Sequence, residues 1–169
     1  MKYNELGDTG VRVSEFSLGC WPFAGGKVWG RQENSDSIAT VHAALDNGIT
    51  TFDTAEGYND EHHSEEVLGN ALTGRRTEAV IATKISGSHL AADEVESTCE
   101  ASLKRLGTDY IDLYQVHWPN HGIPIDETYR AVDALKQSGK VRAIGVCNFA
   151  IQDLQDLLSV GSIVTDQLP

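Results

Sequence analysis

The amino-acid sequence predicts an α/β protein with a parallel sheet, in which residues 1–169 form a single domain. Short apolar segments typical of strands alternate with segments whose apolar residues recur every three or four positions, as in amphipathic helices. This alternation indicates parallel strands joined by right-handed crossovers. It fits both an open doubly wound sheet and part of a closed (β/α)8 barrel of the TIM type. No G-x-G-x-x-G or G-x-x-x-x-G-K-[ST] motif follows a strand, which favours the barrel.

The expected strands begin with an N-terminal β-hairpin. Two short extended segments, 3–6 and 11–13, flank a turn-rich Gly-Asp-Thr-Gly at 7–10. Residues 19–33 are rich in glycine, which predicts a long loop. The six strands expected after the hairpin are apolar runs at 16–18, 49–52, 79–83, 110–116, 141–146 and 163–167.

Helices are expected between these strands. The first takes Asn34 or Ser35 as its N-cap, carries an apolar face and stops at the Asn-Gly of 47–48. The second opens with Ser-Glu-Glu at 64–66, where the acids suit the positive end of the helix dipole. The third has an apolar stripe from 95 to 106 and ends at Gly107. The last two cover 125–138 and 151–158, each followed by a glycine.

Charge and composition exclude several classes of protein. Thirteen Lys and Arg face 25 Asp and Glu, a formal net charge of −12, which would repel nucleic acid and anionic membrane surfaces. No stretch approaches the ~18 apolar residues of a membrane span, and the polar N-terminus lacks the apolar core of a signal peptide. Three widely spaced cysteines indicate free thiols in a reducing compartment. We therefore expect a cytoplasmic protein with neither a nucleic acid nor a membrane as partner.

Polar residues close four consecutive predicted strands. Asp53, Lys84, His117 and the pair Cys147-Asn148 stand at these ends, and Tyr58 follows in the loop after Asp53. Singly, each has an ordinary interpretation: a turn cap, a solvated lysine, a core histidine or a packing aromatic. Together they gain weight, because the C-terminal ends of parallel strands meet on one rim, where reactive residues gather.

This set of residues suits reduction of a carbonyl group. Tyrosine, with a pKa of ~10, is a poor proton donor until a neighbouring ammonium lowers that pKa. Lys84 can supply the charge and Asp53 can hold the lysine in place, so that Tyr58 acts as the general acid. His117 can orient the carbonyl oxygen by a hydrogen bond. The hydride must come from a cofactor, because no side chain supplies one.

Metal binding and cysteine chemistry are the rival interpretations. Residues 62–66 carry two histidines and two glutamates, but adjacent histidines rarely face one metal from a regular element. His117 and His121 have a ligand-like spacing only on a helix, and Pro119 between them opposes a helix. Cys147 has no neighbouring cysteine or base in sequence. We therefore expect no metal site and no cysteine nucleophile.

Longer motifs carry a resemblance to a known family. They are TGVRVSEFSLG, FDTAEGY, SEEVLGNAL, VIATK, LKRLGTDYIDLYQVHWP, LKQSGKVRAIGVCNF and DQLP. With these motifs the chain resembles the aldo-keto reductases, NADPH-dependent carbonyl reductases built on a (β/α)8 barrel. The resemblance implies that Asp53, Tyr58, Lys84 and His117 form the catalytic tetrad, and that the substrate is an aldehyde or ketone.

The resemblance also implies the residues that contact NADP(H) and substrate. Contacts to the nicotinamide carboxamide fall on Asn148, Gln167 and Cys147, the last standing where the family usually has serine. Cofactor contacts further include Cys20, Trp21 and Asp53. The residues expected near the substrate are Trp21, Trp29 and Trp118.

The resemblance stops near strand six. A complete barrel of this type takes about 250 residues, so we expect an incomplete barrel, truncated near that strand, whose open sheet edges promote self-association. Three functions follow from this expectation. In the first, the chain carries the catalytic residues of an NADPH-dependent reductase. In the second, it is a non-catalytic regulatory protein that binds a nicotinamide cofactor; potassium-channel β subunits, which resemble this family, are the example. In the third, it is an inactive fragment.

Overall fold

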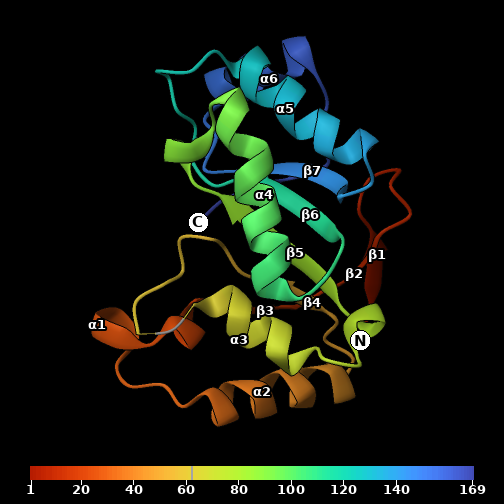
Figure 1. The fold of residues 1–169 in the computed structure, drawn as a ribbon. Coiled ribbons are helices and arrows are strands. Elements are labelled where there is room, and N and C mark those ends of the chain that lie inside the picture. The colour runs from red at the N-terminus through yellow and green to blue at the C-terminus, as the bar shows by residue number, and fades with distance from the viewer. Residues whose placement is uncertain (62) are drawn as a thin grey trace.

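A computed structural model describes residues 1–61 and 63–169, and it contains two sheets (Figure 1). The first is the predicted antiparallel hairpin, β1 (Tyr3–Glu5) and β2 (Arg12–Ser14). The second has six parallel strands in chain order, which confirms the predicted α/β class and strand number. These strands are β3 (Ser17–Gly19), β4 (Thr51–Asp53), β5 (Val80–Ile85), β6 (Ile111–Val116), β7 (Val141–Cys147) and β8 (Asp166–Gln167).

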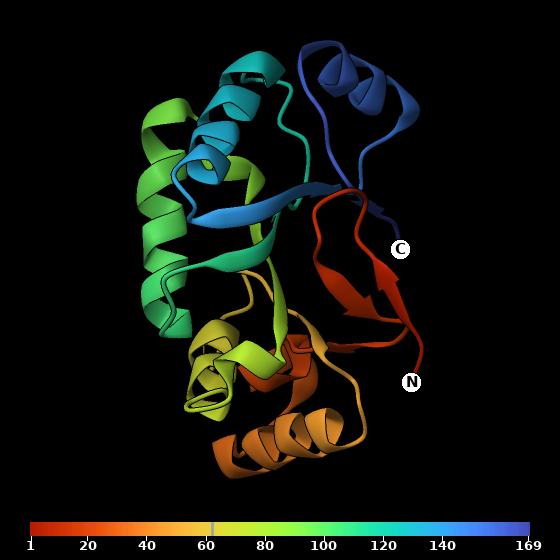
Figure 2. The ribbon, with the colours of Figure 1, turned by 90° about the vertical axis from the view of Figure 1, so that its right-hand side faces the viewer.

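The sheet curls like half of a barrel. Each strand pairs with the next one in sequence, so every crossover moves one position in the same direction. Figure 2 shows α3, α4 and α5 on one side of the strands and the hairpin on the other. The longer helices are α2 (Asn34–Asp46), α3 (Ser64–Ala71), α4 (Ala92–Leu106), α5 (Ile125–Gln137) and α6 (Ile151–Val160).

The helix α4 illustrates how local sequence sets the elements. Its first turn holds Asp93 and Glu94 and its last turn Lys104 and Arg105, which complements the helix dipole at both ends. Gly107 terminates the helix at a φ of 64°, and its N–H donates to the Leu103 carbonyl. Such a left-handed cap strongly favours glycine.

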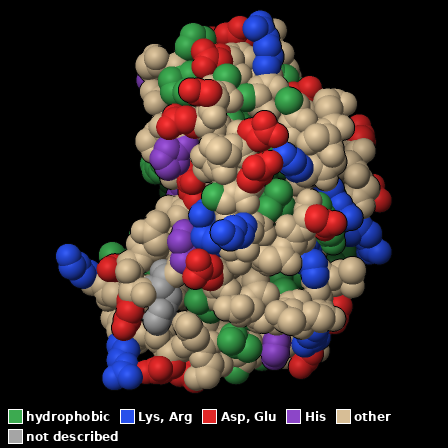
Figure 3. Space-filling view, in the orientation of Figure 1, with side chains coloured by type: hydrophobic (Ala, Val, Ile, Leu, Met, Phe, Trp, Pro, Cys, Tyr) green, Lys and Arg blue, Asp and Glu red, His purple; other side chains and the backbone are tan. Residues whose placement is uncertain are grey.

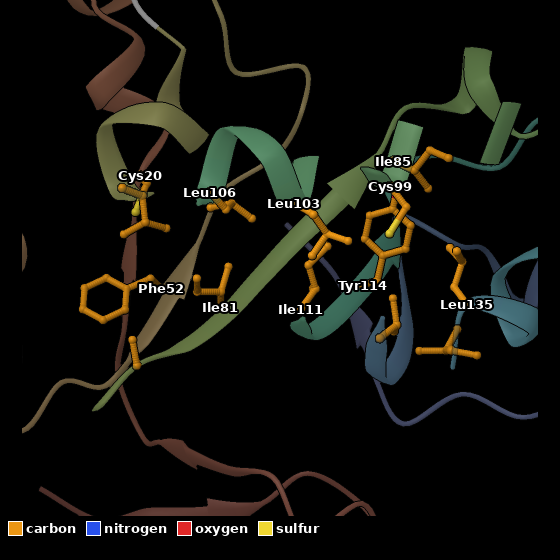
Figure 4. Close-up of a cluster of buried hydrophobic side chains, with 14 of the residues drawn as sticks. Cys20, Phe52, Ile81, Ile85, Cys99, Leu103, Leu106, Ile111, Tyr114 and Leu135 are labelled. Carbon is orange, nitrogen blue, oxygen red and sulfur yellow. The ribbon is translucent and has the colours of Figure 1, made fainter. Parts of the chain in front are cut away.

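The main core lies between the sheet and its helices (Figure 4). Phe52, Ile81 and Ile111 from the strands meet the α4 stripe of Cys99, Leu103 and Leu106. A smaller cluster sits on the other face of the sheet, where hairpin-turn Leu6 packs with Val164 against Ala82, Leu113 and Ala143. The hairpin therefore covers part of the inner face of the sheet.

Several boundaries differ from those predicted. The expected loop 19–33 contains a 3-10 turn (Trp21–Ala24) and a short helix, α1 (Gly26–Trp29). The N-cap of α2 is Glu33, not Asn34 or Ser35. The last strand keeps only Asp166–Gln167 of the predicted 163–167, because only these residues pair with β7. The three cysteines are free, as predicted, and the structure shows that all three are buried. Within the described part of the chain, none of the helices has the length and apolar character that a membrane crossing requires.

Candidate active site

The predicted polar residues meet at the C-terminal edge of the six-stranded sheet. Asp53 ends β4, Lys84 lies near the end of β5, and His117 directly follows β6. The parallel register aligns Lys84 with Gln115, and Cys147 with Gln167. A cavity of about 120 Å³ opens there, lined by Tyr58, Lys84, His117, Cys147, Asn148, Gln167, Leu168 and Pro169.

Lys84 is almost fully buried, with 1% of its surface exposed. Its ammonium donates to Asp53 Oδ1 at 2.6 Å, to the Thr54 carbonyl at 2.9 Å and to Tyr58 Oη at 3.4 Å. A buried ammonium requires partners of this kind to offset its desolvation. The predicted link from Asp53 through Lys84 to Tyr58 is therefore present as a chain of hydrogen bonds.

Tyr58 is held between two aromatic rings. Its ring stacks on Trp21 at 5.6 Å between centroids and meets His117 edge-on at 5.6 Å. Burial raises the pKa of its hydroxyl above the ordinary value, while the Lys84 ammonium lowers that pKa. Lys84 therefore acts on the pKa of Tyr58 in the predicted direction, but burial outweighs the lysine in the protein alone. At neutral pH the hydroxyl is protonated and can donate its proton.

His117 is neutral at physiological pH. Burial lowers the pKa of its imidazole, and the Lys84 ammonium lowers that pKa further. Two hydrogen bonds fix the backbone of His117. The His117 N–H donates to the Ile85 carbonyl, and the His117 carbonyl accepts from Asn148 Nδ2. A neutral imidazole carries one N–H, which suits a hydrogen-bond donor to a carbonyl oxygen.

Gln167 is the centre of a second hydrogen-bond network. Its Oε1 accepts from Gln115 Nε2 at 3.1 Å and from Cys147 Sγ at 3.4 Å. Its Nε2 donates to Asp53 Oδ2 at 3.2 Å. Burial raises the pKa of Cys147 to about 12, so this side chain is a neutral thiol. The network links the second carboxylate oxygen of Asp53 to three neighbouring strands.

Two contributors to the site were missed at the level of sequence. Gln115 stands two residues before His117 on β6, so alternation of strand side chains places it on the inner face and would have identified it. Glu56 lies in the loop between Asp53 and Tyr58. Its Oε1 accepts from the Ser86 N–H at 2.6 Å and pairs with His89 Nδ1 at 2.9 Å. Glu56 therefore ties the Tyr58 loop to the segment after β5.

Three further residues predicted to contact cofactor or substrate do not line this cavity: Trp29, Trp118 and Cys20. Trp29 packs edge-on against Trp21, with 5.4 Å between ring centroids. Trp118 is 56% exposed, and it does not line the cavity. Cys20 is fully buried and its thiol contacts the Leu18 carbonyl. Its side chain belongs to the core, its N–H donates to the Asp53 carbonyl, and its carbonyl accepts from the Phe23 N–H and the Ser64 hydroxyl. Cys20 therefore offers no group to a ligand in this structure, and the expected cofactor contact is not seen at this residue.

The histidine-rich segment 62–66 is only partly described, because His62 lies outside the described residues. Glu65 is buried and accepts from Thr83 Oγ1 and Arg105 Nε, which explains it as a structural residue. In the described part of the chain, no three His, Cys, Asp or Glu side chains are grouped to hold a metal ion.

Comparison with known proteins identifies the family. The model of the Aldo/keto reductase family matches residues 15–168. The chain belongs to the aldo/keto reductase family. The "Aldo-keto reductase YhdN" of Bacillus subtilis is 42% identical over 179 residues, covering 100% of this chain and 54% of the relative. The "NADH-specific methylglyoxal reductase" of Escherichia coli is 35% identical, covering 96% of this chain and 57% of that protein.

Solved aldo/keto reductases share the fold. The crystal structure of the thermostable aldo-keto reductase Tm1743 with the inhibitor epalrestat superposes with a TM-score of 0.91 at 37% identity, covering 99% of this chain and 62% of that one. An aldo-keto reductase from Klebsiella pneumoniae in complex with NADPH gives a TM-score of 0.83 at 34% identity, covering 92% and 54%. The chain thus spans about half the length of the curated relatives it matches.

The cavity has polar groups that fit the carboxamide of a nicotinamide ring. NADPH, which carries this ring, is bound in the solved aldo-keto reductase from Klebsiella pneumoniae. Asn148 has a left-handed φ of 60°, which asparagine tolerates. Among the described residues, its side chain makes a hydrogen bond through Nδ2 only. Its Oδ1 is free to accept from an amide. The second N–H of Gln167 Nε2 is free to donate to a carbonyl oxygen. The residues present therefore suit the group.

Proposed function

We propose that this chain carries the catalytic residues of a reductase that transfers a hydride from NADPH to the carbonyl of an aldehyde or ketone. The observation that carries the proposal is the contact of the buried Lys84 ammonium with both Asp53 and the Tyr58 hydroxyl. Protonation of a carbonyl oxygen needs an acid, here the Tyr58 hydroxyl, and a nearby positive charge that makes it stronger, here the Lys84 ammonium. The Asp53 carboxylate holds this ammonium in place.

The role of each residue follows from its position. The bound nicotinamide supplies the hydride. Tyr58 donates the proton of its hydroxyl to the carbonyl oxygen, and Lys84 stabilises the tyrosinate that is left. His117, neutral, donates one N–H to the same oxygen. Asn148 and Gln167 would hold the carboxamide and so limit the orientations of the bound cofactor.

Cofactor and substrate preference are finer parts of the proposal. The family member from Klebsiella pneumoniae was solved with NADPH, whereas the Escherichia coli relative is named NADH-specific. We expect the chain to prefer NADPH as its cofactor, and binding of NADH is the comparison that tests this preference. The relative named a methylglyoxal reductase supports a small carbonyl compound as substrate. Trp21 and Trp29, in contact with each other beside Tyr58, offer an aromatic surface to such a compound.

The test is the substitution Tyr58→Phe. It removes the hydroxyl and leaves the ring stacked on Trp21. Turnover of model aldehydes with NADPH should fall by about 10²-fold or more, which is the usual contribution of a general acid, while the dissociation constant of NADPH stays within about twofold. Tyr129→Phe, which removes a hydroxyl that accepts from the Ser162 N–H, is the matched control.

The same pair of variants separates the alternatives. A regulatory nicotinamide-binding protein would bind NADPH and show no turnover that depends on the Tyr58 hydroxyl. Unchanged turnover in Tyr58→Phe would refute the assigned acid. Absence of both binding and turnover in the folded wild-type chain would refute the proposal for this chain.

A further inference from the structure

A second cavity lies at the opposite end of the sheet from the candidate active site. Its volume is about 360 Å³, and it is bounded by the hairpin and by the residues at which β4 to β7 begin. The lining residues are Tyr3, Gly10, Val11, Arg12, Thr50, Thr77, Glu78, Ala79, Val80, Tyr110, Asp112 and Arg142. In Figure 3, Lys and Arg side chains lie among Asp and Glu side chains along the right-hand edge, where Figure 1 places β1.

Two arginines are fixed around one buried carboxylate at the base of this cavity. Asp112 is 2% exposed, and its two oxygens accept from Arg76 at 2.7 Å and from Arg142 at 3.0 Å. Both guanidinium carbons lie 4.0 Å from the centre of the Tyr110 ring. One carboxylate thus faces two guanidiniums, and a positive charge remains. Arg76 uses all three of its guanidinium nitrogens within the protein. Arg142 makes hydrogen bonds to the described part of the chain through Nη1 only.

Arg12 adds a second uncompensated charge. Its guanidinium lies 5.5 Å from the centre of the Tyr3 ring and has no carboxylate within ion-pair distance in the described part of the chain. Glu5 stands opposite Arg12 across the hairpin but does not line the cavity. The other lining carboxylate, Glu78, binds Arg75, which it shares with Asp46. Arg12 is therefore a cation of the cavity lining that is not held in an ion pair with any described residue.

We propose that this cavity binds a small oxyanion, the phosphate or carboxylate group of a metabolite, between Arg12 and Arg142. The guanidinium fork matches such groups in two-point hydrogen bonds. The hydroxyls of Thr50 and Thr77, which also line the cavity, supply further donors. The volume is within the range of small-molecule sites. The ligand is separated from the candidate active site by the length of the strands, so this is a second site.

The test measures binding of inorganic phosphate and, separately, of succinate by calorimetry at constant ionic strength. Arg12→Gln should weaken binding at least about tenfold, because it removes a charged hydrogen-bonding partner. Lys104→Gln is the matched control, since it makes the same charge change at a lysine with no ion pair in the described chain. In the wild-type protein, the bound anion should also protect Arg12 from phenylglyoxal, read out by peptide mass.

Each outcome decides the proposal. If only phosphate binds in an Arg12-dependent way, the ligand is a phosphate ester. If only succinate does, the ligand is a carboxylate. If both do, the cavity is a general oxyanion site. The proposal is overturned by absence of binding of either anion at about 10 mM, or by equal affinity in Arg12→Gln and wild type. It is also overturned if Lys104→Gln weakens binding as much as Arg12→Gln does. Protection of Arg12 in the wild type supports it even if Arg12→Gln does not fold.

Discussion

Removal of the Lys84 ammonium is the sharpest perturbation of the candidate active site. Lys84→Met keeps a long side chain of similar shape and deletes the charge that lies 3.4 Å from Tyr58 Oη. Burial already raises the pKa of Tyr58, and Lys84 is the group that lowers it. The substitution should therefore raise this pKa further and make Tyr58 a weaker acid.

The size of the effect follows from the distance. Two unit charges 3.4 Å apart interact by about 1 kcal/mol in water and by about 5 kcal/mol at an effective dielectric constant of ~20. One pKa unit corresponds to about 1.4 kcal/mol. The pKa of Tyr58 should rise by between about one and about four units. We expect the rate of hydride transfer in a single turnover to fall at least about tenfold.

The assay follows NADPH absorbance in single turnovers with a model aldehyde, so that product release does not hide the chemical step. Lys84→Met also leaves Asp53 without its ammonium partner. The double variant Lys84→Met with Asp53→Asn removes that orphaned carboxylate, and its rate should stay low if the ammonium is what matters. A single-turnover rate within about twofold of wild type for Lys84→Met would show that the ammonium does not assist Tyr58.

Two further predictions concern protonation and packing. The pKa of His117 is lowered by burial and then by Lys84, so NMR titration should place its midpoint below the ordinary value, and Lys84→Met should move that midpoint upward; an unchanged midpoint would contradict the cause. A Cβ at Gly69 would lie 2.6 Å from the Leu106 carbonyl oxygen, so Gly69→Ala should lower the free energy of unfolding by about 1–3 kcal/mol. Denaturant unfolding checks this against Asn70→Ala on the exposed side of α3, and equal stability of both variants would exclude the close α3–α4 contact.

Much of the sheet and of the candidate site was predictable, because local sequence patterns indicate where each strand lies and where it ends. Six apolar runs separated by helical segments predicted the parallel sheet, and all six form strands. The convergence of Asp53, Lys84 and His117 followed from a single rule, that parallel strands end on one rim. The distance from Lys84 to Tyr58 was beyond the sequence, because it depends on the path of the loop that Glu56 ties to the segment after β5.

Properties that depend on burial could not be read from the sequence. The net direction of the Tyr58 pKa shift is set by a competition between desolvation and Lys84, and spacing in sequence gives the partner but not the degree of burial. The short helix α1 was missed because glycines usually mark loops. The cavity beside Arg12 is formed by segments from 3 to 142, and no local pattern indicates that they meet.

The central claim, that this chain builds a nicotinamide site around Tyr58, is tested most directly by titrating its tryptophan fluorescence with NADPH, with NADH for comparison. Trp21 stacks on Tyr58, so it should report occupation of the site. We expect saturable quenching that Trp21→Phe largely removes and Trp118→Phe retains. A folded sample that neither nucleotide quenches would contradict the central claim.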